Sequence, residues 1–198
     1  QNQPASKSMT HPNGLLLLST CYALFMWPFG YIVSNANLLF TSILNPQHSL
    51  TLSKTIETQA YEYTFTFLAL LWILPILGGY ISQRMGYFRA AAVGLSFCII
   101  SNLCLAFSHF LGSSHQLFIT FCGLSLFLSG NSLFTPAAWC LVDHLYSKQD
   151  KRRESGFTLF YLIFNIGGIM GIFVAGAFTS YHLAFLVCTS ILFFSMVT

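Results

Sequence analysis

Five asparagines stand inside long apolar stretches of this 198-residue sequence and are its clearest candidates for binding chemistry: Asn35, Asn37, Asn102, Asn131 and Asn165. A side-chain amide both donates and accepts hydrogen bonds, so it can hold an uncharged polar group. Polar side chains at such positions in a membrane protein indicate functional sites, because hydrocarbon does not solvate them. The competing role is an inter-helix hydrogen bond, worth about 0.6 kcal/mol. The motifs around Asn131 and Asn165 favour the binding role for these two.

Residue patterns for catalysis or metal binding are missing. No HExxH motif occurs, and no Ser/His/Asp or Cys/His arrangement is recognisable. Asp143, beside His144, is the one candidate for an intramembrane carboxylate, but it lies at a span end before a basic loop that would supply its partners. The six cysteines form no CxxC pair, and we expect their thiols to pack as small apolar groups. The sequence therefore predicts no enzyme, no cofactor and no metal site. The hypothesis of an intramembrane enzyme would need a chemical activity that is lost when Asp143 or His144 is changed.

The charged residues are few and clustered. Lys and Arg number 8, Asp and Glu number 5, and together they make up 7% of the chain, against about 25% in soluble proteins. Mean hydropathy is +0.68. Charge-free apolar stretches cover residues 14–44, 63–83, 90–142 and 155–198. About 20 apolar residues in a helix cross a bilayer core of roughly 30 Å, so the chain is predicted to be an integral membrane protein. The net charge of +3 comes from short loops and does not indicate a nucleic-acid partner.

The apolar runs do not alternate as barrel strands do, so the expected fold class is all-α: a polytopic membrane bundle of six transmembrane helices. Polar and turn-prone residues between the runs set the boundaries. A polar tail is expected over residues 1–13 and a six-helix transmembrane domain over residues 14–198. The spans are predicted at about 14–40, 61–81, 89–107, 116–145, 157–178 and 182–197, with a polar loop from the end of the first span to about Gln59.

Basic residues in the short loops predict the orientation. Seven of them fall on one side of the predicted membrane, and only Lys54 falls on the other. Because Lys and Arg in short loops mark the cytoplasmic side, both termini are expected in the cytoplasm. We expect the plasma (inner) membrane.

Glycines and prolines occur together in four of the predicted spans, as in Pro28 with Gly30, and Pro75 with Gly78 and Gly79. Small residues let helices pack closely, and Pro with Gly bends a helix or permits a hinge. Close packing is one explanation. A bundle that rearranges is the other.

Two segments resemble a known family. Residues 75–94 (PILGGYISQRMGYFRAAAVG) resemble the tight cytoplasmic turn between helices two and three of the major facilitator superfamily. Residues 130–168 resemble the proton-dependent oligopeptide transporter family within that superfamily. The matching positions are Gly130-Asn131, Pro136, Arg152-Arg153, Ser155-Gly156, Phe160-Tyr161, Asn165 and Gly167. Six spans with both ends inside are similar to the N-terminal half of such a transporter.

The resemblance implies a peptide pocket between two six-helix halves that opens alternately to either side. It places Asn165 where the family contacts the peptide, Trp72 where the family has an aromatic facing the pocket, and Asn131 in the helix-four motif. Thr135 and Tyr161 belong to the same motifs and complete the expected substrate-binding set. The implied partners are the lipid bilayer, a small solute that could be a peptide, and a second six-helix half from this or another chain.

The departures from the family pattern concern charge. The first span (CYALFMWPFGY) has no counterpart of the family's Glu-x-x-Glu-Arg motif, Thr135 replaces the helix-four lysine, and Gln83 replaces an aspartate. We hypothesise that this half neither binds a peptide carboxylate nor relays a proton by the family's usual route. An uncharged pocket would suit a less charged solute, or none. Two functions stay open: a solute transporter of the oligopeptide-transporter type (for a di- or tripeptide or a related solute), present here as its N-terminal half, and a non-transporting or truncated relative.

Overall fold

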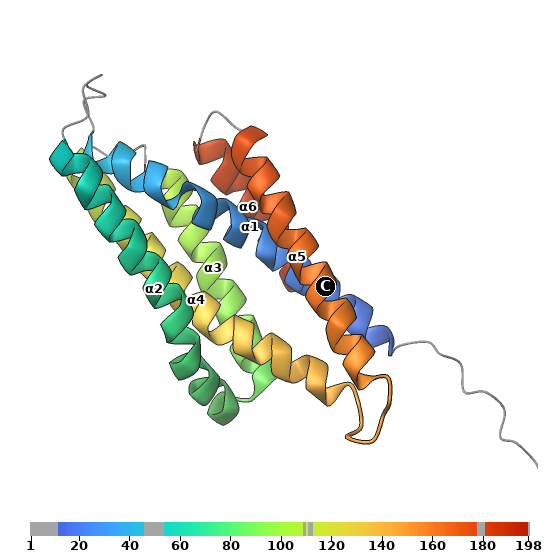
Figure 1. Cartoon of the computed structure of the whole chain (residues 1–198). Helices are drawn as coiled ribbons and strands as arrows, with labels where there is room; N and C mark the ends of the chain where they lie inside the picture. The colour runs from blue at the N-terminus through green and yellow to red at the C-terminus, as the bar shows by residue number, and fades with distance from the viewer. Residues whose placement is uncertain (1–11, 46–53, 109, 111–112, 178–180, 198) are drawn as a thin grey trace, which may run out of the picture.

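The structure is a computed structural model that describes residues 12–45, 54–108, 110, 113–177 and 181–197. These residues form six α-helices, as expected, arranged as an elongated bundle (Figure 1). The helices are α1 (Asn13–Leu44), α2 (Lys54–Met85), α3 (Tyr87–Ser108), α4 (Ser113–His144), α5 (Arg153–Ala177) and α6 (Tyr181–Val197). Most of the predicted polar tail lies outside the described residues, whereas Asn13 already belongs to α1.

Five helices are long and apolar enough to cross a membrane, among the residues that the structure describes. α1, α2 and α4 each have 32 residues, which at 1.5 Å per residue is about 48 Å and exceeds a bilayer core. α6 is shorter, with 17 residues. The chain is therefore an integral membrane protein with several apolar spans.

α2 begins earlier than the predicted polar loop allowed. Residues 54–59 were expected in that loop, yet the helix starts at Lys54. Glu57 lies in its first turn, where a negative charge is favourable at a helix N-terminus, and the Thr58 hydroxyl donates to the Lys54 carbonyl oxygen at 2.9 Å. The favourable charge of Glu57 and a Thr58 hydroxyl bonded within the helix are compatible with a helical conformation of this polar turn.

The turn between α2 and α3 consists of one residue, Gly86. Its φ of 88° lies in the left-handed region, which costs glycine little. The Gly86 amide donates to the Ser82 carbonyl oxygen at 3.0 Å and closes α2, and the Ala90 amide donates to the Gly86 carbonyl oxygen at 3.0 Å. The segment that resembles a tight turn is therefore tight in the structure.

Glycines set the closest helix crossings. A Cβ on Gly94 would lie 2.8 Å from the Gly130 carbonyl oxygen, and a Cβ on Gly130 would lie 2.6 Å from the Gly94 carbonyl oxygen, so α3 and α4 meet backbone to backbone. A Cβ on Gly171 would lie 3.1 Å from the Gly30 Cα, which brings α5 equally close to α1. These two pairs, α3 with α4 and α1 with α5, share the most extensive contacts, whereas α4 and α5 share little.

Candidate solute pocket

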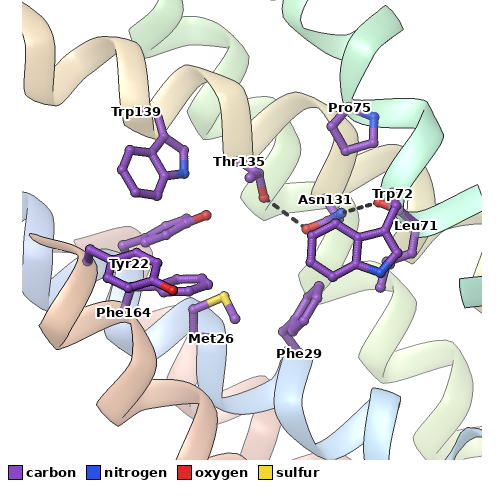
Figure 2. Close-up of a pocket in the computed structure, with 11 residues that line it drawn as sticks. Tyr22, Met26, Phe29, Leu71, Trp72, Pro75, Asn131, Thr135, Trp139 and Phe164 are labelled. Atoms are coloured by element: carbon purple, nitrogen blue, oxygen red, sulfur yellow. Dashed lines mark hydrogen bonds between the residues drawn. The ribbon is translucent and has the colours of Figure 1, made fainter. Parts of the chain in front are cut away.

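A cavity of about 410 Å³ lies between α1, α2, α4 and α5. Its eleven lining residues are drawn in Figure 2. They are Tyr22, Met26, Phe29, Leu71, Trp72, Pro75, Asn131, Thr135, Trp139, Tyr161 and Phe164. None of the eleven is charged. A cavity of this size, mostly apolar with a few polar groups, is typical of small-molecule sites.

Aromatic rings form the wall near α5. The Tyr22 ring stacks on Phe164, with centroids 5.4 Å apart, and on Phe160 behind it, at 5.0 Å. Trp139 lies edge-on to Phe160 at 5.0 Å and parallel to Phe157 at 6.2 Å. These ring contacts join α4 to α5, which otherwise share little.

The polar part of the pocket is a chain of uncharged groups across three helices. The Thr135 hydroxyl donates to the Asn131 side-chain oxygen at 2.9 Å, and the Asn131 amide nitrogen reaches the Leu71 carbonyl oxygen of α2 at 3.5 Å (Figure 2). The side chain of Tyr22, from α1, interacts with Thr135. Asn131 is 3% exposed, so its amide is held in one orientation in a nearly dry setting.

Four of the five residues predicted for substrate binding line this one pocket: Trp72, Asn131, Thr135 and Tyr161. Trp72 and Tyr161 come from α2 and α5 and are 75% and 55% exposed, so they stand at the open side of the cavity. Asn165 lies apart from them. It lines a neighbouring cavity of about 230 Å³ together with Ser34, and Phe164 is shared by both cavities. Its side-chain nitrogen donates to the Tyr161 carbonyl oxygen at 2.7 Å.

The inter-helix hydrogen bond that competed with the binding role is not seen for the other three asparagines among the described residues. Asn35 and Asn102 donate to carbonyl oxygens one turn earlier in their own helices, at 3.0 Å and 2.8 Å, and Asn37 accepts from Thr41, also in its own helix. Among the five, the hydrogen bond of Asn131 to Leu71 is the one that crosses between helices in the part that the structure describes. Side-chain amides in a helix often bond to the preceding turn, so sequence position alone does not indicate a partner helix.

Sequence reasoning missed the aromatic residues of the pocket, Tyr22, Phe29, Trp139 and Phe164. A usable signal was present: Tyr22, Phe25 and Phe29 follow helical spacing, as do Phe157, Phe160 and Phe164. This spacing indicates one ring-covered face on each helix, but it does not distinguish a pocket from lipid contact.

The expected thiol packing holds only in part. Cys98 and Cys188 are buried, Cys21, Cys104 and Cys140 are half-buried, and Cys122 is exposed. Within the described residues the thiols are free, and no cluster of three metal-ligating side chains is found.

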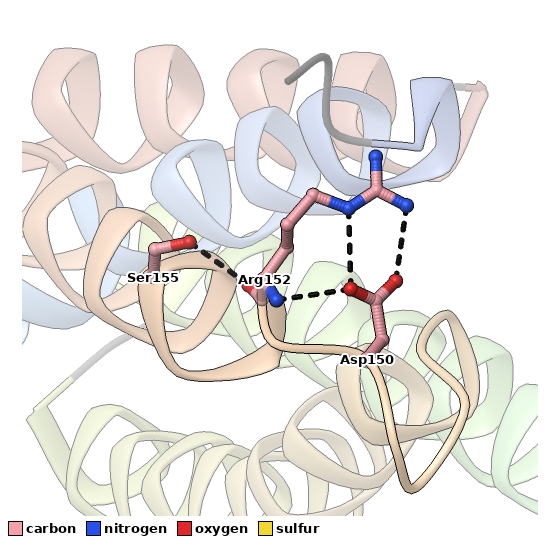
Figure 3. A network of polar contacts seen from close by, with 3 residues as sticks. All are labelled: Asp150, Arg152 and Ser155. Carbon is pink, nitrogen blue, oxygen red and sulfur yellow. Dashed lines mark hydrogen bonds and ion pairs between the residues drawn. The ribbon is translucent and has the colours of Figure 1, made fainter. Parts of the chain in front are cut away.

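The end of the bundle that contains the α2–α3 turn and the α4–α5 loop, called the basic end below, carries most of the charge. Two ion pairs order its longer loop. Arg152 forms a two-pronged contact with Asp150 (Nε to Oδ1 3.2 Å, Nη2 to Oδ2 3.0 Å), and the Ser155 hydroxyl donates to the Arg152 carbonyl oxygen (Figure 3). The Asp150 hydrogen bond and charge raise the pKa of the Arg152 guanidinium. Arg153 pairs with Asp143 and so joins the start of α5 to the end of α4.

Solved structures show which class of protein this fold defines. A crystal structure of a POT family transporter in complex with 5-aminolevulinic acid superimposes with a TM-score of 0.81 over 98% of this chain and 39% of that chain, at 24% identity. A crystal structure of the peptide transporter POT (E310Q mutant) in complex with alafosfalin gives a TM-score of 0.78, with 39% of that chain covered, also at 24% identity. The fold therefore matches part of the fold of a POT family transporter, about 39% of its length.

Sequence comparison supplies the family. The profile described as the POT family matches residues 88–198, more than half of the chain. The chain belongs to the POT family, which is a family of transporters and not of enzymes.

Curated relatives are longer. The uncharacterized transporter YclF of Bacillus subtilis (strain 168) is 31% identical over 121 residues, which cover 59% of this chain and 23% of the relative. A di-/tripeptide transporter of Lactococcus lactis subsp. lactis (strain IL1403) is 29% identical over 133 residues, covering 65% of this chain and 26% of the relative. The matched region thus spans about a quarter of the length of these relatives.

Proposed function

We propose that this chain is the first six-helix half of a POT-type transporter and supplies one wall of a solute pocket that opens by alternating access. The observation that carries the proposal is the cavity between α1, α2, α4 and α5, which places Trp72, Asn131, Thr135 and Tyr161 around one space. Family membership supports the transporter class. The solute, transport by this chain and the second half belong to the proposal.

The uncharged lining of the pocket favours a solute that has no charged group on the part that this half binds. Asn131 and Thr135 offer an amide and a hydroxyl, while Tyr22, Trp139 and Phe164 offer ring faces. A free carboxylate or ammonium buried here would lose its hydration without gaining a counter-charge from these walls, which is costly. A capped peptide or another neutral solute with an aromatic or apolar body fits this wall better than a zwitterionic peptide.

The second half would cover the open side of the pocket. α2 and α5 present the rims, where Trp72 and Tyr161 are exposed. A six-helix partner from this or another chain would pack there and close the cavity. The same proposal places the protein in the plasma (inner) membrane with the basic end in the cytoplasm, because six of the seven described Lys and Arg residues lie at that end.

Uptake into proteoliposomes that contain the intact protein tests the function. With an imposed pH gradient, a terminally capped aromatic dipeptide should accumulate faster than the same dipeptide with free termini. Thr135→Lys should reverse this preference, because a lysine in the pocket supplies a partner for a carboxylate. Thr66→Lys, an exposed α2 residue outside the pocket, is the matched control.

Proton-driven uptake of the free dipeptide that is abolished by changing Asn165 would refute the uncharged-solute proposal. Absence of both binding and uptake for every solute tested, with the protein folded, would favour the alternative of a non-transporting relative. The lack of charge in the pocket is the observation behind that alternative.

A further inference from the structure

A second large cavity, a groove of about 430 Å³, lies at the basic end between α1, α3, α4 and α6, away from the solute pocket. Its walls are almost entirely hydrocarbon and include Leu17 of α1, Ala92 and Leu95 of α3, Leu141 of α4 and Val197 of α6. Several of the side chains that line it are open to the surroundings: Leu17 is 53% exposed, and Val197 is 86% exposed. The groove is therefore accessible from the outside of the bundle.

The polar atoms in the groove are already bonded to one another. The Ser195 hydroxyl donates to the Cys21 carbonyl oxygen at 2.9 Å, and the Cys21 sulfur lies 3.1 Å from the Ser195 hydroxyl oxygen. Cys21 belongs to α1 and Ser195 to α6, so this contact also joins the two helices that form one wall. With its hydrogen-bonding groups satisfied, the groove offers an occupant apolar contact and little else, unlike the pocket around Asn131.

The groove is close to positive charge. Phe88 lines it and is 77% exposed, and the next residue, Arg89, is also exposed, in the first turn of α3. Among the described residues, no carboxylate lies within ion-pairing distance of Arg89. By contrast Arg84 stacks on the Tyr80 ring, with its guanidinium carbon 4.7 Å from the ring centre.

The basic end as a whole also carries a net positive charge. Its six basic residues (Arg84, Arg89, Lys148, Lys151, Arg152 and Arg153) and three acidic residues (Asp143, Asp150 and Glu154) leave a net charge of +3. The Tyr87 ring lies 5.4 Å from the ring of His144, so the start of α3 and the end of α4, with its charged loop, are neighbours. A long apolar groove near unpaired positive charge at a membrane surface complements a molecule with an apolar tail and an anionic head.

We propose that this groove binds an anionic phospholipid from the leaflet next to the basic end, with one acyl chain along α3 and the phosphate near Arg89. Leu95 lies about two turns into α3, one of the helices long and apolar enough to cross a membrane, so an acyl chain is the partner at hand at its depth. Basic residues just outside a membrane span attract anionic lipids. The site is separate from the solute pocket and does not depend on transport.

Mapping by cross-linking on the unaltered protein tests the position. Phosphatidylglycerol with a photoactivatable group on one acyl chain is added to the detergent-solubilised full chain, and labelled peptides are identified by mass spectrometry. Labels should concentrate on residues 17–21, 88–95 and 195–197. Labels spread evenly over the lipid-facing helices, or concentrated elsewhere, would overturn the proposal.

Thermal unfolding with added lipid tests the chemistry. Dioleoyl phosphatidylglycerol should raise the melting temperature more than dioleoyl phosphatidylcholine, and glycerol phosphate without acyl chains should have no effect. Ala92→Trp, which fills the groove, should remove the shift from both lipids. Ile100→Trp, on the same helix but outside the groove, should keep it.

Arg89→Gln should make the two lipids equivalent, while Arg84→Gln should preserve the preference for phosphatidylglycerol. Equal shifts from both lipids in the unaltered protein, or a full shift in Ala92→Trp, would contradict the proposal. If Ala92→Trp does not fold, the Arg89→Gln comparison and the cross-linking map decide.

Discussion

The hydroxyl of Thr135 donates a 2.9 Å hydrogen bond to the side-chain oxygen of Asn131, one turn earlier on α4. The bond occupies the acceptor of the amide and directs its nitrogen toward α2, where the contact with the Leu71 carbonyl oxygen is long at 3.5 Å. A long hydrogen bond is weak, so this N–H is the pocket group best placed to exchange its partner for a solute acceptor. Thr135, at the position where the family pattern has a lysine, thus orients a neutral hydrogen-bond donor.

Removing this bond should destabilise the bundle. Thr135→Val keeps the shape of the side chain but leaves the buried Asn131 oxygen without a donor, which should lower the free energy of unfolding by about 0.5–1.5 kcal/mol. Thr66→Val, whose hydroxyl bonds to the Glu62 carbonyl oxygen at an exposed site, is the matched control. Thermal unfolding in detergent measures both, and equal effects would contradict the structural role of the Thr135 bond.

Two adjacent glycines of α2 should respond oppositely to alanine. A Cβ on Gly78 would collide with the Ser132 carbonyl group of α4, so Gly78→Ala should cost about 1–3 kcal/mol. A Cβ on Gly79 would meet Pro136 at 3.5 Å, an ordinary contact, so Gly79→Ala should be neutral or add up to about 1 kcal/mol. Melting temperatures of the two variants compare them directly, and similar losses in both would show that the α2–α4 crossing is looser than described.

Two neighbouring residues of α5 should contribute unequally to solute binding. Tyr161→Ala removes a wall of the 410 Å³ pocket, whereas Asn165→Ala changes the cavity behind Phe164. We expect Tyr161→Ala to weaken binding of a capped aromatic dipeptide at least tenfold and Asn165→Ala less than threefold. Equilibrium binding to the purified protein measures both. A larger effect at Asn165 would place the solute in the smaller cavity.

Alkaline pH should weaken the α4–α5 loop through Tyr146. This residue is 6% exposed, and its burial raises the pKa of the phenol above 10.0, an effect that Arg152 partly opposes and Asp150 reinforces. Because the folded-state pKa exceeds the unfolded value, the stabilising contribution is complete below about pH 10 and declines as the pH rises through the folded-state pKa.

Tyr146→Phe should therefore flatten the fall in melting temperature above pH 10. The same substitution at Tyr61, which is 47% exposed, is the control. An unchanged alkaline slope in Tyr146→Phe would rule out the buried phenol as its cause.

Charge spacing and turn residues predicted the six helices well, because an apolar stretch of about 20 residues without ionic side chains is compatible with few structures other than a membrane-spanning helix. Polar residues predicted helix ends less well: Lys54 and Glu57 belong to α2, since a charged segment can be helical when it meets the needs of a helix start. Hydropathy alone does not distinguish a polar loop from a polar first turn of a helix.

The pocket could be predicted only where motifs indicated residues, as for Asn131 and Tyr161. Asn165 was expected in the same site but lines a different cavity, because it lies one turn farther along α5 than Tyr161, about 6 Å, where Ser34 and Gly168 form the lining. Tyr22 and Trp139 were missed because ring-rich helix faces also suit lipid, and only the packing of α1 against α5 shows which rings line a cavity.

The contrast between helix contacts has a mechanical consequence. α3 with α4, and α1 with α5, touch through glycine backbones, whereas α4 and α5 meet through Trp139 and the rings of Phe157 and Phe160. Flat rings can part and restack, while the Arg153–Asp143 ion pair joins α4 and α5 at the basic end. Any widening of the cavity between α4 and α5 would therefore separate these rings first, away from the ion pair.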